Sequence, residues 1–189
     1  AGLFFALPFK PKKSVLNDLN PGVAGVLRDF SCRSAKSCSA IRITKAEAAK
    51  RIAAVKAGSG RVCDRLVAHR LSMNAKGTSV SPTVLGRALG KRINLRVSSH
   101  CKEYEERLRG TKVQSRDFRK VMSAHSGSGS FTFLDPPYHK ITGLYPVEGV
   151  TPAEVCDAVR GADGKVLVTY NNSREVRKAC RGLHMRVVK

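Results

Sequence analysis

The fold that we expect for this chain depends most on one segment, Phe131-Thr132-Phe133-Leu134-Asp135-Pro136-Pro137-Tyr138. Its first four residues are mostly apolar and favour extended backbone, which predicts a buried strand over 131–134. The two prolines that follow lack N–H donors and cannot continue a strand ladder, so they predict a stiff, extended turn. Such a turn would hold one carboxylate, one free carbonyl and one aromatic ring around a small space.

Strands and helices alternate at short spacing on either side of this stretch. Further strands are predicted at 14–17, 112–115, 165–170 and 184–188, and helices at 119–124, from Thr151 and at 173–180. This alternation predicts an α/β fold with a parallel sheet and crossover helices. Ligands of such sheets bind at the carboxyl ends of the strands, where Asp18, Asp117 and Asp135 fall.

The middle of the chain has a different, mainly helical pattern. Helices are predicted at 23–28, 44–56, 62–71 and 99–108, and loops at 30–39 and 72–90. The 44–56 helix would begin with a capping box, because Thr44 precedes Glu47 by three residues.

The chain is strongly basic. Its formal net charge is +21, and the stretch from Ser31 to Lys120 has 22 Lys and Arg against 6 Asp and Glu. A field of this sign attracts polyanions, and nucleic acid is the first partner to consider. A generally basic proteome or an acidic protein partner would also account for the charge.

The six cysteines are scattered, with no C-x-x-C pair, and the histidines lack the spacing of metal ligands. We therefore expect no metal site, and we interpret the cysteines as free thiols in a reducing cytoplasm. No apolar stretch approaches the ~20 residues that a membrane span needs, so we expect no membrane segment. The apolar start at 1–7 lacks the pattern of a signal peptide.

The turn after the 131–134 strand suits recognition of an amine on a planar ring. Asp135 and the carbonyl of Pro136 can each accept a hydrogen bond from an exocyclic amine, while Tyr138 can stack on the ring that bears it. A base extruded from a duplex has this chemistry. The alternative is a plain strand-ending turn with a surface tyrosine.

The Asp-Pro-Pro-Tyr motif resembles that of Dam-type DNA adenine-N6 methyltransferases, and further segments are similar to this family in the expected order. The resemblance implies a Rossmann-like, S-adenosylmethionine-dependent α/β core at 1–29 and 111–189. It also implies a mainly helical, basic target-recognition insertion at 30–110. The catalytic residues it implies are Asp135, Pro136, Pro137 and Tyr138.

The resemblance also assigns residues to S-adenosylmethionine. The segment from Gly2 to Leu7 is similar to the end of the family's glycine-rich loop and the helix after it, and Asp18 matches the acid that binds the cofactor ribose. The cofactor-binding residues it implies are Gly2, Asp18, Asp117, Phe118 and Asp135. Helix capping is the alternative role for Asp18 and for Asp117. The segment 168–172 is similar to the family's next strand and its polar end, and Tyr170 and Asn171 could simply end that strand.

The insertion would contact DNA through residues that hold phosphates or read base edges. The candidates are Arg70, Asn74, Lys76, Lys91 and Arg92. The alternative for each basic residue is a solvated surface position. His139 follows Tyr138 and could line the same cleft.

Only Ala1-Gly2 of the family's glycine-rich loop is present, and the family's first and closing strands are missing, so the resemblance implies a core truncated at both ends. The resemblance implies an enzyme that methylates a flipped adenine in double-stranded DNA. It implies a cytoplasmic monomer, encoded by a prokaryote, phage or plasmid, from a family common in restriction-modification systems. The alternatives are methylation of cytosine N4 or of an RNA base, and a nucleic-acid-binding remnant without activity. Methyl transfer of this kind needs positioning and electrostatics but no metal.

Overall fold

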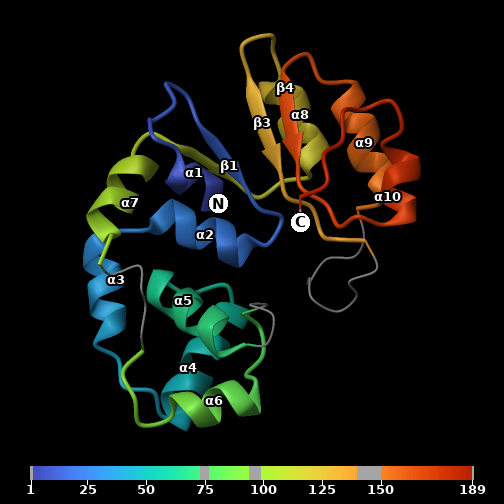
Figure 1. Ribbon diagram of the computed structural model, residues 1–189. Helices are drawn as coiled ribbons and strands as arrows, with labels where there is room; N and C mark the ends of the chain where they lie inside the picture. Colours follow the sequence, from blue (N-terminus) through green and yellow to red (C-terminus); the bar gives the residue numbers. More distant parts are fainter. Residues whose placement is uncertain (1, 73–76, 94–98, 140–149, 189) are drawn as a thin grey trace. The chain divides into compact units, whose positions relative to one another are not determined.

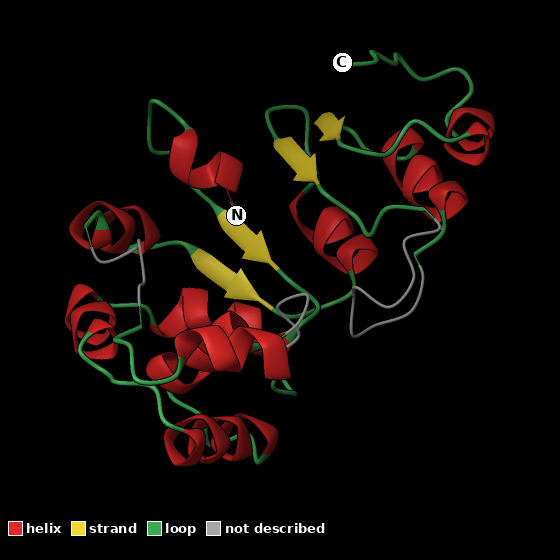
Figure 2. Cartoon of the chain, turned by 60° about the horizontal axis from the view of Figure 1, so that its bottom comes forward, coloured by secondary structure: helices red, strands yellow, loops and turns green. Residues whose placement is uncertain are grey.

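The computed structural model describes residues 2–72, 77–93, 99–139 and 150–188 of the chain. These residues form two compact units, Ala1–Ser115 and Arg116–Lys189, which we describe separately (Figure 1). Figure 2 shows one pair of short strands in each unit, with helices beside it.

The first unit is mainly helical. Its elements are α1 (Gly2–Ala6), β1 (Val15–Asn17), α2 (Pro21–Asp29), α3 (Cys32–Ser39), α4 (Lys45–Lys56), α5 (Val62–Leu71), α6 (Pro82–Ala88), α7 (Cys101–Leu108) and β2 (Lys112–Gln114). Strand β1 pairs in parallel with β2, from Val15 opposite Lys112 to Asn17 opposite Gln114. Helices α2 to α7 therefore come, in chain order, between two strands that are neighbours in space, as expected for a helical segment inserted into an α/β unit.

The core of the first unit forms where α3, α4 and α5 meet the segments around Ile43 and Ile93. Its buried members are Cys38, Ile43, Ala48, Val67, Leu71 and Ile93. Helix α4 begins as its sequence predicts, because the hydroxyl of Thr44 accepts a hydrogen bond from the Glu47 amide at 3.0 Å. The Glu47 carboxylate bonds Arg51 on the next turn, at 2.8 Å.

The second unit contains α8 (Phe118–His125), β3 (Phe131–Leu134), α9 (Pro152–Arg160), β4 (Lys165–Val168) and α10 (Arg174–Ala179). Strands β3 and β4 pair in parallel, from Phe131 opposite Lys165 to Leu134 opposite Val168. A strand, a helix and a parallel strand in this order form a βαβ unit, the building block expected from the alternating pattern. Helix α9 starts with Thr151 and Glu154 in a reciprocal capping box.

Three secondary-structure predictions are wrong. The segment expected as a loop at 30–39 contains α3, because Ser31 caps a helix whose buried face includes Ala35. The loop expected at 72–90 contains α6, which starts at Ser81 and Pro82 with cap and proline in their favoured positions. The strand expected at 184–188 is absent, and Val187 and Val188 are 62% and 85% exposed.

The expectation of free thiols is also wrong. All six cysteines lie in described segments and form disulfides, Cys32–Cys101, Cys38–Cys63 and Cys156–Cys180. Each pair joins two segments of the same unit: the first two bridges join helices, and the third joins α9 to the residue directly after the helix Arg174–Ala179. Spacing along the sequence does not reveal these pairs.

The described residues thus combine helices with short parallel strands in two separate two-stranded sheets. The Rossmann-like core and its division from an insertion at 30–110 stay predictions. No helix among the described residues is long and apolar enough to cross a bilayer.

Candidate functional site

The carboxyl ends of β3 and β4 lie side by side in the second unit. Beyond the paired strands, the amide of Thr169 donates to the carbonyl of Leu134 at 3.0 Å. This extra ladder bond brings the residue after β3, Asp135, next to Thr169. The parallel register therefore places the start of the Asp-Pro-Pro-Tyr motif beside the segment 169–172.

A hydrogen bond orients the Asp135 carboxylate. The hydroxyl of Thr169 donates to Oδ1 of Asp135 at 2.7 Å. Asp135 is exposed, and no other described residue donates to its second oxygen, Oδ2. No described residue donates to the carbonyl of Pro136 either, so both oxygens have the chemistry to accept a hydrogen from an amine.

Asn171 ties the far end of the motif to the end of β4. Its Oδ1 accepts from the amide of His139 at 3.0 Å, and its Nδ2 donates to the carbonyl of His139 at 3.1 Å. One side chain thus satisfies both backbone groups of the residue after Tyr138. The motif is therefore held at both ends, by Thr169 at Asp135 and by Asn171 at His139.

Two tyrosine rings lie between these anchors. The ring centroids of Tyr138 and Tyr170 are 6.2 Å apart, with an angle of 32° between the planes. The Tyr170 hydroxyl is buried, and among the described residues it has no hydrogen-bond partner. Burial raises the pKa of Tyr170, and the charge of Glu154 raises it further. The phenol is therefore neutral at ordinary pH.

His139 has its ring near an acidic side chain of α10. Its Nε2 lies 4.0 Å from Oε2 of Glu175 and is buried, with no hydrogen bond to any described residue. The distance is too long for a hydrogen bond but short enough for an electrostatic attraction when the ring is protonated. The His139 ring therefore lies next to α10, on the chain segment that follows the motif.

Asp117 caps a helix, the alternative that the sequence left open for it. Its Oδ1 accepts from the amide of Arg119 at 2.9 Å at the start of α8, while the Arg119 guanidinium bonds both carboxylate oxygens. These bonds to Arg119 hold the pKa of Asp117 at about 2. Arg119 also bonds Glu154 at 2.8 Å and lies over the Phe118 ring. The cofactor roles of Asp117 and Phe118 stay predictions.

Asp18 follows β1 in the first unit. Its Oδ1 accepts from the amide of Asn20 at 2.8 Å, and Asn20, not Asp18, caps α2. No described residue donates to Oδ2 of Asp18, and desolvation by burial raises the pKa of this carboxyl. A partly buried carboxylate with a free oxygen at a strand end fits a ribose hydroxyl. Gly2, the other residue predicted for the cofactor in this unit, is exposed at the start of α1.

The residues predicted to contact DNA lie in the first unit. Arg70 is exposed at the end of α5, and Lys91 and Arg92 are exposed after α6. Asn74 and Lys76 lie outside the described residues.

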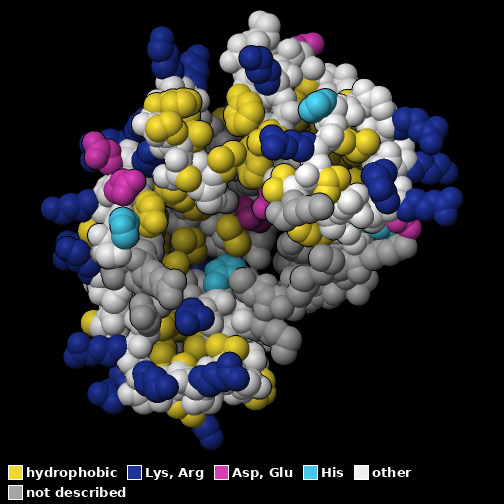
Figure 3. Space-filling view, viewed as in Figure 1, with side chains coloured by type: hydrophobic (Ala, Val, Ile, Leu, Met, Phe, Trp, Pro, Cys, Tyr) yellow, Lys and Arg dark blue, Asp and Glu magenta, His cyan; other side chains and the backbone are white. Residues whose placement is uncertain are grey.

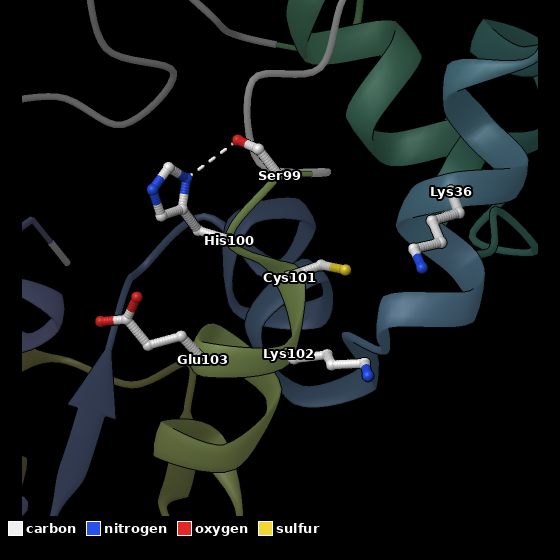
Figure 4. Close-up of a pocket in the computed structure, with 6 residues that line it drawn as sticks. All are labelled: Lys36, Ser99, His100, Cys101, Lys102 and Glu103. Carbon is white, nitrogen blue, oxygen red and sulfur yellow. Dashed lines mark hydrogen bonds between the residues drawn. The ribbon is translucent and has the colours of Figure 1, made fainter.

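A pocket in the first unit is formed by different residues. Figure 4 shows Lys36 of α3 facing residues 99–103 at the start of α7, with the Ser99 hydroxyl 2.9 Å from Nδ1 of His100. None of the predicted site residues lines it. Among the described residues, no three His, Cys, Asp or Glu side chains gather as a metal site would require.

The sequence matches no protein-family model, and a comparison with curated proteins finds no match. The interpretation therefore depends on the motif and on the geometry of its surroundings.

Sequence reasoning missed two neighbours of the motif, Thr169 and Glu175. Thr169 lies in the segment 168–172, which was singled out, but only the strand register shows that its hydroxyl faces Asp135. A polar residue directly after a predicted neighbouring strand is the signal that could have found it.

Proposed function

We propose that this chain carries the site of an S-adenosylmethionine-dependent methyltransferase acting on adenine N6 in DNA. The observation that supports it best is the anchored Asp-Pro-Pro-Tyr motif at the carboxyl ends of two parallel strands. Its polar groups include two acceptors that receive no hydrogen bond from any described residue, Oδ2 of Asp135 and the carbonyl of Pro136. An amine with two hydrogens, directed by a ring stacked on Tyr138, matches this set.

The residues would act by positioning. Two hydrogen bonds from the adenine amine, to Asp135 and Pro136, would direct the nitrogen lone pair away from both acceptors and towards the methyl group. Partial positive charge develops on the nitrogen as it reacts, and the Asp135 carboxylate stabilises that charge. The bond from Thr169 keeps the carboxylate in one orientation before substrate arrives.

S-adenosylmethionine, when bound, would supply the methyl group. In the first unit Asp18 suits one of its ribose hydroxyls, because no described residue donates to Oδ2 of this partly buried carboxylate.

The test is product analysis. The purified chain is incubated with S-adenosylmethionine and duplex DNA, and the digested nucleosides are identified by mass spectrometry. We expect N6-methyladenine, and a loss of about 100-fold or more in Asp135→Ala, comparable to removal of one group that stabilises developing charge. Asp163→Ala, which removes an exposed carboxylate elsewhere in the same unit, is the matched control.

Methylcytosine without methyladenine would assign the site to a different amine. A folded chain that binds S-adenosylhomocysteine but modifies no base would contradict the proposal altogether.

A further inference from the structure

A short antiparallel contact in the first unit brings two basic segments together. The segment 41–43 pairs with 90–93 through hydrogen bonds from the amides of Ile43, Gly90 and Ile93, each 2.9 to 3.0 Å long. In this pairing Arg42 lies directly opposite Arg92. Lys91 is the neighbour of Arg92, and Arg87 lies in the last turn of α6, just before this segment.

Like charges directly opposite each other in an antiparallel pair are destabilising. Side chains in such positions start from Cβ atoms only ~5 Å apart, so the repulsion between Arg42 and Arg92 is built into the backbone pairing. Purely structural needs would be met better by an apolar or oppositely charged pair. An anion bound to both arginines would offset the repulsion between them.

The backbone beneath these side chains is fixed. Ile43 and Ile93, the residues that follow Arg42 and Arg92, are 0% and 5% exposed in the core of the unit. The Arg42 guanidinium donates to the carbonyl of Gly90 at 2.6 Å, which holds it over the turn. The basic groups are therefore presented on a rigid base, which lowers the entropy lost when they bind a ligand.

The charged residues of the neighbouring chain segments are all basic. The segments 30–46 and 65–102 contain no Asp or Glu, although they hold 4 and 8 Lys and Arg, respectively. Among the described residues, the arginines in ion pairs are Arg51, Arg65, Arg119 and Arg160. No described carboxylate pairs with Arg42, Arg87, Lys91 or Arg92. In Figure 3 several Lys and Arg side chains cover the end of this unit where α4 and α6 lie.

We propose that Arg42, Arg87, Lys91 and Arg92 form a basic platform that binds the phosphate backbone of duplex DNA. A DNA strand carries one phosphate charge per ~3.4 Å of helix axis, so adjacent phosphates can occupy the two arginines at once. The platform contacts backbone and reads no sequence, so it positions DNA without selecting the base. The choice of DNA rests on the proposed function, whereas the location of the platform does not.

The experiment measures binding of the full chain to a fluorescently labelled DNA duplex over a series of salt concentrations. The duplex is not selected for adenine methylation sites. The Arg42→Ala/Arg92→Ala variant should bind at least tenfold more weakly, and the slope of log K against log salt should fall by about two. Arg42→Lys/Arg92→Lys keeps both charges and should retain most of the slope. Lys12→Ala/Lys13→Ala, which removes two exposed charges of the same unit, is the matched control.

Circular dichroism and thermal unfolding establish that each variant folds. An unchanged slope in folded Arg42→Ala/Arg92→Ala would overturn the platform, as would an equal loss in Lys12→Ala/Lys13→Ala. Binding to polyglutamate but not to DNA would overturn the choice of partner. Absent methylation by the unchanged chain, together with platform binding that the Arg42→Ala/Arg92→Ala substitutions weaken, would contradict the proposed function alone.

Discussion

The hydroxyl of Thr169 donates a hydrogen bond of 2.7 Å to Oδ1 of Asp135, across the ends of two parallel strands. The bond fixes which oxygen of the carboxylate stays available. It also joins the Asp-Pro-Pro-Tyr motif to β4, a strand that follows it by about thirty residues in the chain.

Thr169→Val replaces the hydroxyl by a methyl group of similar shape. Since hydrogen bonds to charged groups are worth about 1.5–3 kcal/mol, we expect methyl transfer to fall roughly tenfold or more. The fall should be in kcat, because substrate contacts remain. Thr169→Ser, which restores the donor, should recover most of the rate in the same assay. A Thr169→Val rate equal to that of the unchanged protein would show that Asp135 needs no orienting partner.

Asn171 makes two hydrogen bonds to the backbone of His139 and should stabilise the second unit. Asn171→Ala leaves both backbone groups without this partner, and we expect the free energy of unfolding to fall by about 1–3 kcal/mol. Urea denaturation measures the change. Asn172→Ala, at the exposed neighbouring position, is the control and should change stability little. Equal effects of the two substitutions would mean that the bridge to His139 contributes nothing.

The sequence predicts the strands of both pairs and most of the helices, because their signals are local. Thr44 before Glu47 and Thr151 before Glu154 mark helix starts, and the apolar residues of 131–134 mark a strand. Helix α6 carried a similar signal in Ser81 and Pro82, but the glycines around it favoured a loop interpretation.

Other features depend on contacts between distant residues. Helix α3 is rich in serine, which favours helices weakly, and it is stabilised by the burial of Cys32, Ala35 and Cys38. The segment 184–188 has strand-like composition but pairs with no described strand. The candidate site also combines local and distant signals. The local Asp-Pro-Pro-Tyr motif identifies Asp135, whereas its contact with Thr169 depends on the register of β3 and β4.

Asp117 should make stability depend on pH in a defined window. Its pKa in the folded state is about 2, lowered from 3.8 chiefly by the side-chain hydrogen bond from Arg119. A carboxyl whose pKa is lowered on folding contributes stability above its unfolded pKa and loses it as the pH falls through its folded pKa. The contribution should therefore be complete above about pH 4 and disappear towards pH 2.

Asp117→Asn tests this, because asparagine caps helices as well as aspartate but carries no charge. Urea denaturation should show the variant less stable than the unchanged protein near neutral pH, with the difference vanishing towards pH 2. Both side chains of the pair are substantially exposed, so added salt should shrink the difference. A difference of the same size at pH 2 as at neutral pH would contradict the ion-pair explanation.

Gly77 should tolerate a side chain less well than another glycine with the same backbone conformation. Gly77 has φ +71° and Gly58 has φ +73°, but a Cβ on Gly77 would lie 3.0 Å from the His69 ring, whereas a Cβ on Gly58 would meet nothing within 4 Å. Gly58→Ala should cost about 1–2 kcal/mol for the left-handed conformation alone. Gly77→Ala should cost roughly 1–3 kcal/mol more, because the ring must move. Equal losses in urea denaturation would show that the His69 ring yields freely.

We expect the three disulfides to be present in the protein in solution. This prediction disagrees with the expected cytoplasmic location, because cytoplasmic thiols stay reduced. Digestion without reductant should release peptides joined at Cys32–Cys101, Cys38–Cys63 and Cys156–Cys180. The Cys32–Cys101 bridge spans 69 residues and Cys156–Cys180 spans 24, so loop entropy makes loss of the first roughly 1 kcal/mol more destabilising. Paired Cys→Ser variants in urea denaturation measure this order. Complete alkylation of all six cysteines in the native, unreduced protein would contradict the pairing, because no thiol should be available to react.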